Sequence, residues 1–219
     1  MDAPGGAGIR PADALAAESE PFVPDLTKWA SWHPEDVAHR LAAVEAPWRI
    51  AAGWAIDLFL GGERREHEDT EIAVPHARFG EVAAALSDCD FFVAGHPPGF
   101  VSTASAEARE ATHQTWARER STGLWRLDVF REPWDGDEWV CRRDERIRLP
   151  YEEVVERTPE GIPYERPELV LLFKAKHARP KDEDDLEAVL PALGPERRRL
   201  LADWLALAHP GHAWLARLD

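Results

Sequence analysis

The stretch from Trp48 to Pro75 constrains the fold of this chain more than any other part of the sequence. It predicts a short apolar strand, a glycine turn at Gly53, a helix over Trp54–Leu60 and, after a charged loop, a second strand over Asp69–Val74. Glycine lets the backbone approach a ligand closely, and the N–H groups that open a helix attract anions. The turn is therefore a candidate phosphate-binding site.

Two acidic residues lie on the second predicted strand. Side chains alternate between the faces of a strand, so Asp69 and Glu71 are expected to point the same way. Neighbouring carboxylates repel each other unless a cation lies between them, and Mg²⁺ prefers such hard oxygen ligands. A solvated strand edge produces the same pair, so the pattern alone leaves both interpretations open.

A second informative strand is predicted over Trp125–Phe130. Leu127 and Val129 would face one side and Asp128 the other. An unpaired buried charge is costly, so an aspartate in an apolar strand needs a partner or a function. Either a nearby arginine such as Arg126 pairs with it, or it contributes to a site.

The motif residues resemble a known superfamily. Gly-Trp-Ala-Ile-Asp at 53–57, then Leu-Gly, then Arg-x-His-x-Asp-x-Glu at 65–71 is similar to the nucleotidyltransferase superfamily typified by DNA polymerase β. The similarity is closest to the branch of aminoglycoside 2''-adenylyltransferases and lincosamide nucleotidyltransferases. Members of that branch usually carry glycines where this chain has Ala51 and Ala52, and an aspartate in place of Glu71.

The resemblance implies an α+β fold, with a small mixed β-sheet backed by helices and a helical C-terminal region. It also implies an enzyme that moves a nucleoside monophosphate from ATP, or another NTP, to a hydroxyl of a small antibiotic-like acceptor, with release of pyrophosphate. Asp69, Glu71 and Asp128 would hold Mg²⁺, and Asp128 would be a metal ligand or the base that accepts the hydroxyl proton.

Further residues are candidates for nucleotide binding. Gly53 and the N–H groups from Trp54 onward would contact the phosphates, and Arg65 would neutralise the leaving pyrophosphate. By resemblance, Lys174 on a later helix would also approach the phosphates. The alternative for Lys174 is an ion pair with a nearby acidic residue. His67 is expected to organise the loop before Asp69.

The composition limits the kinds of molecule that the protein is expected to bind. The chain has 219 residues and a net charge of −15, and no basic face is evident, which argues against gripping a nucleic-acid backbone. A cationic acceptor would suit an acidic cleft, although acidity also serves solubility. Two cysteines, no signal-like N-terminus and no long apolar run indicate a cytoplasmic protein without a membrane span.

We expect a flexible tail over residues 1–25, a nucleotidyltransferase core over 26–150 and a mainly helical region over 151–219. The C-terminal helices would either cap the acceptor cleft or form a homodimer contact. Two other functions stay open: a nucleotidyltransferase-fold protein that modifies a protein or RNA, as toxin–antitoxin relatives do, and a catalytically silent binding module.

Overall fold

The computed structural model describes residues 21–95, 101–103, 109–110 and 112–218. Most of the tail expected over residues 1–25 lies outside this part of the chain. From residue 21 onward the chain contacts the sheet, because the ring of Phe22 packs edge-on against Phe92, with centroids 5.6 Å apart.

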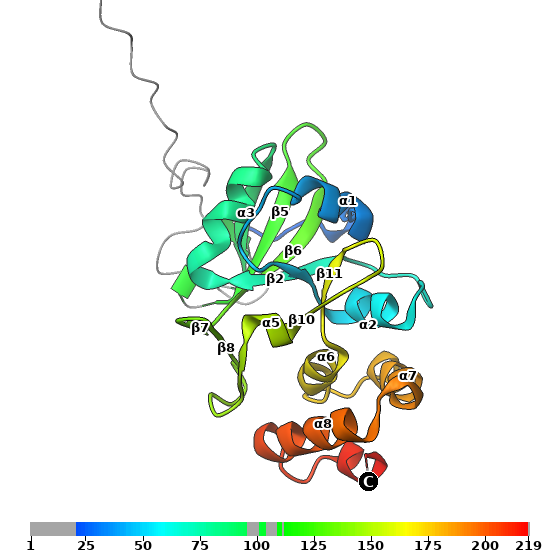
Figure 1. Cartoon of the computed structure of the whole chain (residues 1–219). Coiled ribbons are helices and arrows are strands. Elements are labelled where there is room, and N and C mark those ends of the chain that lie inside the picture. The colour runs from blue at the N-terminus through cyan, green and yellow to red at the C-terminus, as the bar shows by residue number, and fades with distance from the viewer. Residues whose placement is uncertain (1–20, 96–100, 104–108, 111, 219) are drawn as a thin grey trace, which may run out of the picture.

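The fold is centred on an eight-stranded mixed sheet with the strand order β10-β11-β1-β2-β6-β5-β3-β4 (Figure 1). The pairs β1–β11 and β2–β6 are parallel, and the other neighbours are antiparallel. The strands are β1 Arg49–Ile50, β2 Glu71–Pro75, β3 Cys89–Ala94, β4 Val101–Thr103, β5 Gln114–Glu119, β6 Trp125–Glu132, β10 Val155–Arg157 and β11 Pro163–Glu165. The expected mixed sheet of an α+β fold is confirmed.

A second, three-stranded sheet has the order β7-β8-β9 and consists of Trp134–Asp135, Glu138–Val140 and Arg148–Pro150. The strands β7 and β8 pair antiparallel as a hairpin. It turns at Gly136, whose φ of 60° lies in the left-handed region that glycine favours.

Helices cover the sheet and form the C-terminal region. They are α1 Pro34–Arg40, α2 Ala52–Leu60, α3 Phe79–Ala85, α5 Tyr151–Val154, α6 Pro167–Lys174, α7 Pro180–Val189 and α8 Pro195–Ala208, with short 3₁₀ turns at Leu26–Lys28, His76–Arg78, Leu190–Ala192 and Ala213–Arg217. The last three α-helices gather at one end of the molecule, and α6 packs against α2, α7 and α8 (Figure 1). Prolines at the first helical positions fix the starts of α1, α6, α7 and α8.

The predicted helix after β1 is present, but its start differs from the expectation. It begins at Ala52, so Gly53 lies in its first turn, and the sharp change of direction falls on Ala52, with a φ of 51°. The helix ends at Gly61, where a φ of 85° forms the left-handed cap.

The sheet crosses the boundary expected at residue 150. β10 and β11 come after that residue, yet β11 pairs in parallel with β1, with Tyr164 opposite Ile50. Two strands of three residues are too short to show a reliable alternation of apolar and polar positions. Their place in the sheet depends on pairing with a distant strand.

Two apolar clusters fill the space around the sheet. The larger one joins strand residues such as Ile72 and Val129 to helix residues such as Ile56 and Leu169. The smaller one contains Phe92, Ala94 and Trp125, with Phe22, Trp29 and Trp116 packed against it. Leu127 and Val129 belong to the larger cluster, as the predicted alternation of β6 requires.

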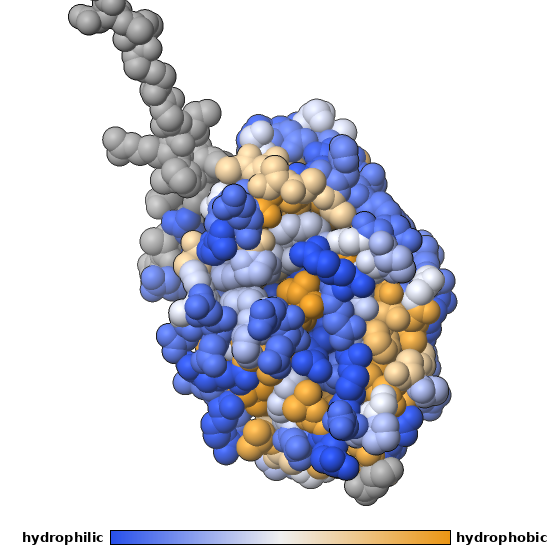
Figure 2. All heavy atoms as spheres, in the orientation of Figure 1, coloured by the Kyte–Doolittle hydropathy of each residue, from blue (hydrophilic) through white to orange (hydrophobic). Residues whose placement is uncertain are grey.

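Much of the molecular surface is polar. The face shown in Figure 2 is mostly hydrophilic, with apolar atoms in separate groups. Among the helices of the described residues, none is both long and apolar enough to cross a membrane.

Candidate active site

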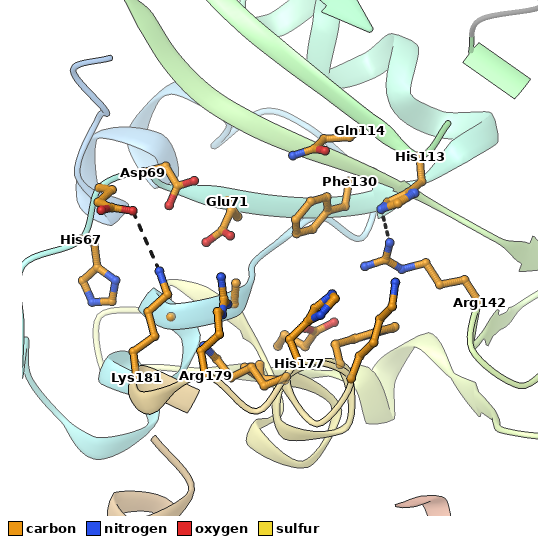
Figure 3. A pocket seen from close by; sticks show the side chains of 18 of the residues that line it. His67, Asp69, Glu71, His113, Gln114, Phe130, Arg142, His177, Arg179 and Lys181 are labelled. Atoms are coloured by element: carbon orange, nitrogen blue, oxygen red, sulfur yellow. Dashed lines mark hydrogen bonds and ion pairs between the residues drawn. The ribbon is translucent and has the colours of Figure 1, made fainter. Parts of the chain in front are cut away.

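A pocket with a volume of about 560 Å³ lies between the large sheet and the segment that follows α6. Figure 3 shows its arrangement: Asp69, Glu71 and Gln114 on the sheet side face His177, Arg179 and Lys181 on the other side. The pocket thus combines acidic groups from the sheet with cations from the C-terminal region.

The parallel pairing of β2 and β6 brings two predicted site residues together. Glu71 and Asp128 are directly opposite each other in the register, so their side chains leave the sheet on the same face. Phe130 follows on that face and lines the pocket. The structure therefore places Asp128 beside Glu71, although the two residues are far apart in the sequence.

Asp69 lies just before the strand, because β2 begins at Glu71 and not at Asp69 as expected. Between the two acids, the Thr70 hydroxyl is buried and donates to the carbonyl of Trp32 over 2.7 Å. The Thr70 amide donates to the Ser31 hydroxyl over 3.1 Å. These bonds fix the segment, and both acids point into the pocket (Figure 3).

Burial and mutual repulsion disfavour the ionised forms of the three carboxyl groups, those of Asp69, Glu71 and Asp128. Burial raises the pKa of Asp69, and burial together with repulsion by Asp69 and Asp128 raises the pKa of Glu71 well above its usual value. Burial, with repulsion by Asp69, raises the pKa of Asp128 to about 7, against the effect of its hydrogen bond to Gln114. A cation among these groups would relieve this cost.

No arginine pairs with Asp128 among the described residues, so the ion-pair alternative is wrong. Arg126 instead binds Glu119 over 2.8 Å and the carbonyl of Ala30 over 2.7 Å. The Gln114 amide donates to Asp128 Oδ2, while Asp128 Oδ1 is buried and has no hydrogen bond of normal geometry. The Trp116 indole also interacts with this carboxyl group, so neutral side chains hold Asp128 and leave its charge open to a cation.

The donor set suits a hard cation such as Mg²⁺, since it consists of the buried Asp128 carboxyl group and the half-buried carboxyl groups of Asp69 and Glu71. As the side chains lie, however, no three Asp, Glu, His or Cys residues of the described chain are grouped closely enough to hold a metal ion. Shared coordination by Asp69, Glu71 and Asp128 therefore requires side-chain rotation.

The start of α2 forms another wall of the pocket through Ala52 and Gly53. No side chain caps this helix, so its first N–H groups are available to an anion. A Cβ on Gly53 would lie 2.5 Å from Arg65 Nη2 and 2.8 Å from the ring of His67. Only glycine allows these side chains to lie so close to the turn.

Of two further predicted nucleotide-binding residues, Arg65 lines the pocket and Trp54 does not. The Trp54 ring is buried between His33 and His67, and its side chain does not line the pocket, which leaves only its backbone near the turn. Arg65 does line the pocket and forms a 3.8 Å ion pair with Asp185.

His67 organises its loop, as its position in the motif suggests. Its Nε2 lies 2.8 Å from Asp57 Oδ2, and its ring stacks on Trp54 with centroids 4.3 Å apart. The amide of Arg64 donates to the same Asp57 oxygen over 3.0 Å. Asp57 thus fixes the loop onto α2.

Lys174 lines the pocket but is held by two acids. Its Nζ lies 3.0 Å from Asp182 Oδ1 and 2.9 Å from Asp185 Oδ2, and both carboxyl side chains are fully buried. This ion-pair cluster corresponds to the alternative weighed for Lys174. Two further cations of the pocket are more exposed: Arg179, with a side chain 55% exposed, pairs with Asp182 over 2.9 Å, and Lys181, 42% exposed, lies 3.9 Å from Glu68.

Sequence analysis missed several residues of this pocket, namely Gln114, Arg142, Arg143, Lys176, Arg179 and Lys181. The chain contains only four lysines, and the concentration of three of them between 174 and 181 was the available signal. The arginines gave no comparable sequence signal, because arginine is common throughout the chain.

Comparisons with known proteins support the nucleotidyltransferase resemblance. Residues 35–112 match the family described as aminoglycoside-2''-adenylyltransferase, a segment that contains Gly53, Asp69 and Glu71 but not Asp128. No curated protein matches the chain in the corresponding sequence search.

Two solved structures share the fold. The solution structure of the antibiotic-resistance factor ANT(2'')-Ia matches with a TM-score of 0.53 and 17% identity, over 85% of this chain and 96% of that chain. The crystal structure of ANT(2'')-Ia in complex with adenylyl-2''-tobramycin matches with a TM-score of 0.54 and 17% identity, over 78% and 94%. The chain therefore has the nucleotidyltransferase fold and resembles the aminoglycoside 2''-adenylyltransferase branch of that superfamily.

Proposed function

We propose that this protein transfers a nucleoside monophosphate from ATP, or another NTP, to a hydroxyl group of a small molecule, with release of pyrophosphate. The observation that carries the proposal is the register of β2 and β6, which places Glu71 beside Asp128 on the face of the sheet that borders the pocket. The family match over residues 35–112 supports the same class of reaction.

Asp69, Glu71 and Asp128 would hold Mg²⁺. When bound, the ion supplies Lewis-acid stabilisation of the charge on the phosphoryl oxygens. The raised pKa values of the three carboxyl groups fit this role, because burial without a cation destabilises their ionised forms.

The acceptor oxygen forms a bond to the α-phosphorus, the bond from that phosphorus to the pyrophosphate oxygen breaks, and the hydroxyl proton passes to Asp128. In this role Asp128 acts as the base and Asp69 and Glu71 hold the ion; without a cation, burial raises the pKa of Asp128 to about 7. The N–H groups at the start of α2 bind the phosphates, and Arg65, Arg179 and Lys181 neutralise the leaving group.

The test is an incubation with ATP, Mg²⁺ and a panel of hydroxyl-bearing small molecules, followed by measurement of pyrophosphate. We expect Mg²⁺-dependent release that Asp128→Asn lowers at least 100-fold, on the order expected when a catalytic base is lost. Asp203→Asn, at an exposed position on α8, is the matched control and should leave release unchanged.

Absence of ATP binding at any Mg²⁺ concentration would refute the proposal. Labelled nucleotide that appears on a protein or RNA, and on none of the small molecules, would instead favour modification of a macromolecule.

A further inference from the structure

Asp128 is buried next to the pocket and does not line it, and the pocket continues past Phe130 to a group of cations that the proposed donor site does not use. Arg142 and Arg143 follow β8, and Lys176 follows α6; all three line the pocket, and together they form what we call the cationic wall. Figure 3 shows Arg142 at the opposite end of the pocket from Lys181.

None of these three residues forms an ion pair with a carboxylate of the described chain. Elsewhere arginines do so readily, as Arg148 does with Asp135 over 2.9 Å and Arg197 does with Glu168 over 2.5 Å. The Nε atoms of Arg142 and Arg143 are buried and make no hydrogen bond. Buried guanidinium donors without an acceptor indicate a binding site for an anion.

The Arg142 guanidinium is held in place by neutral groups. It lies 4.6 Å from the ring centre of Phe173 and 5.5 Å from that of Phe130, and its Nη1 donates to Nε2 of His113. Burial and the charges of Arg142 and Arg143 lower the pKa of His113 to about 4, so the imidazole is neutral and can accept this bond. The guanidinium is thus positioned without its charge being neutralised.

Two acids of the same pocket, Glu132 and Glu165, are already bound by another cation. The buried Arg49 guanidinium contacts Glu132 and lies 3.0 Å from Glu165 Oε1. The Trp139 indole also donates to Glu132 over 2.6 Å. Burial raises the pKa of Glu165, against the opposite effect of Arg49. An excess of positive charge remains at the wall.

Strand β6 runs from Asp128, where the reacting hydroxyl would lie, towards the cationic wall. Phe130 lies two residues beyond Asp128 on the same face and contacts Arg142 through its ring. A molecule whose hydroxyl lies at Asp128 would extend over Phe130 to the wall.

We infer that the acceptor is an anionic hydroxyl compound whose phosphate or carboxylate group binds Arg142, Arg143 and Lys176. This inference rests on the proposed function, because it assigns the hydroxyl end to Asp128. It differs from the cationic acceptor that the net charge of −15 favours, since the local charge at this end of the pocket is positive.

The experiment is calorimetric titration of the full chain with four probes, glucose 6-phosphate, gluconate, glucose and kanamycin. Each is titrated with and without Mg²⁺ and α,β-methylene-ATP. At least one anionic probe should bind at least tenfold more tightly than glucose and than kanamycin. The phosphate and carboxylate probes distinguish the two anionic groups.

Arg142→Gln and Lys176→Gln should each reduce that preference about tenfold, a loss of about 1.4 kcal/mol, and leave the affinity for α,β-methylene-ATP unchanged. Lys176 is exposed, so its replacement does not threaten folding. Arg146→Gln is the matched control, because within the described part of the chain Arg146 pairs only with Asp144, and its side chain is 67% exposed.

Tighter binding of kanamycin, or equal binding of all probes, would overturn the inference. The inference would also be overturned if the variants bound the nucleotide analogue more weakly and the anionic probe as tightly as the wild type does. The cationic wall would then belong to the donor site. Failure of the nucleotide analogue to bind would instead refute the proposed function, while the titrations without it still measure the wall.

Discussion

Glu71 and Asp128 are register partners on neighbouring parallel strands, and burial and mutual repulsion raise the pKa of Glu71 well above its usual value. Two buried acids side by side destabilise a fold unless they serve a ligand. The relationship therefore links the topology of the sheet to the proposed chemistry, and four predictions follow from the surrounding structure.

The first prediction concerns pH. In the folded protein Asp128 keeps its proton up to about pH 7, whereas its ordinary pKa is 3.8. Between these values the native state binds more protons than the unfolded state, so this group makes the free energy of unfolding fall as the pH rises from about 4 to 7. In urea unfolding this fall should be steeper for the wild type than for Asp128→Asn, where only Asp69 and Glu71, whose pKa values are also raised, still contribute to it.

Mg²⁺ provides the complementary measurement, since a bound cation favours the ionised carboxylates. It should raise the melting temperature of the wild type more at pH 8 than at pH 5, and should have a smaller effect on Asp128→Asn. An equal effect of Mg²⁺ on both proteins at both pH values would contradict the assignment.

The second prediction concerns the close approach at Gly53. Gly53→Ala would force Arg65 Nη2 away from a Cβ only 2.5 Å distant and would crowd the first N–H groups of α2. Affinity for ATP with Mg²⁺ should fall about tenfold, which corresponds to one lost charge-assisted contact of about 1.4 kcal/mol. Gly62→Ala, with open space around the added methyl, should change ATP affinity little.

The third prediction concerns Ala52, which adopts a φ of 51° at the start of α2. The left-handed conformation costs an L-residue about 1–2 kcal/mol, and glycine avoids this cost. Ala52→Gly should raise the free energy of unfolding by about 0.5–1 kcal/mol after the greater chain entropy of glycine is included. Ala84→Gly, at an exposed position within α3, should instead lower it by about 1 kcal/mol.

The fourth prediction concerns Lys174 and its buried partners Asp182 and Asp185. Lys174→Met would leave two buried carboxylates short of a cation and should lower the free energy of unfolding by about 3 kcal/mol. Lys28→Met, at an exposed position, should have no measurable effect. A variant that keeps its stability and loses ATP affinity would show that phosphate binding is the main role of Lys174.

Much of the central unit was predictable from the sequence. Gly53 and the helix up to Leu60 follow from glycine punctuation and an apolar run, and the acids at 69 and 71 follow from a short polar alternation before Ile72. These are local preferences of the backbone, which consecutive residues express wherever the chain lies. For the same reason the apolar side of β6, formed by Leu127 and Val129, was predicted correctly.

Other features depended on distant partners. The sequence left open whether Asp128 pairs with an arginine or contributes to a site; the β2–β6 register places it beside Glu71, and Arg126 pairs with Glu119 instead. The register of a strand is set by hydrogen bonds and packing between segments, and a slip of one residue would turn Asp128 to the other face.

The sequence by itself therefore determined the strand–helix–strand unit, the positions of its acids and its family resemblance. The tertiary structure decided that Asp128 lies beside Glu71, that Asp182 and Asp185 pair with Lys174, and that Arg142 forms no ion pair with a carboxylate of the described residues. Local conformational preferences are encoded by neighbours in the chain, whereas the charge balance of a pocket depends on side chains that only folding brings together.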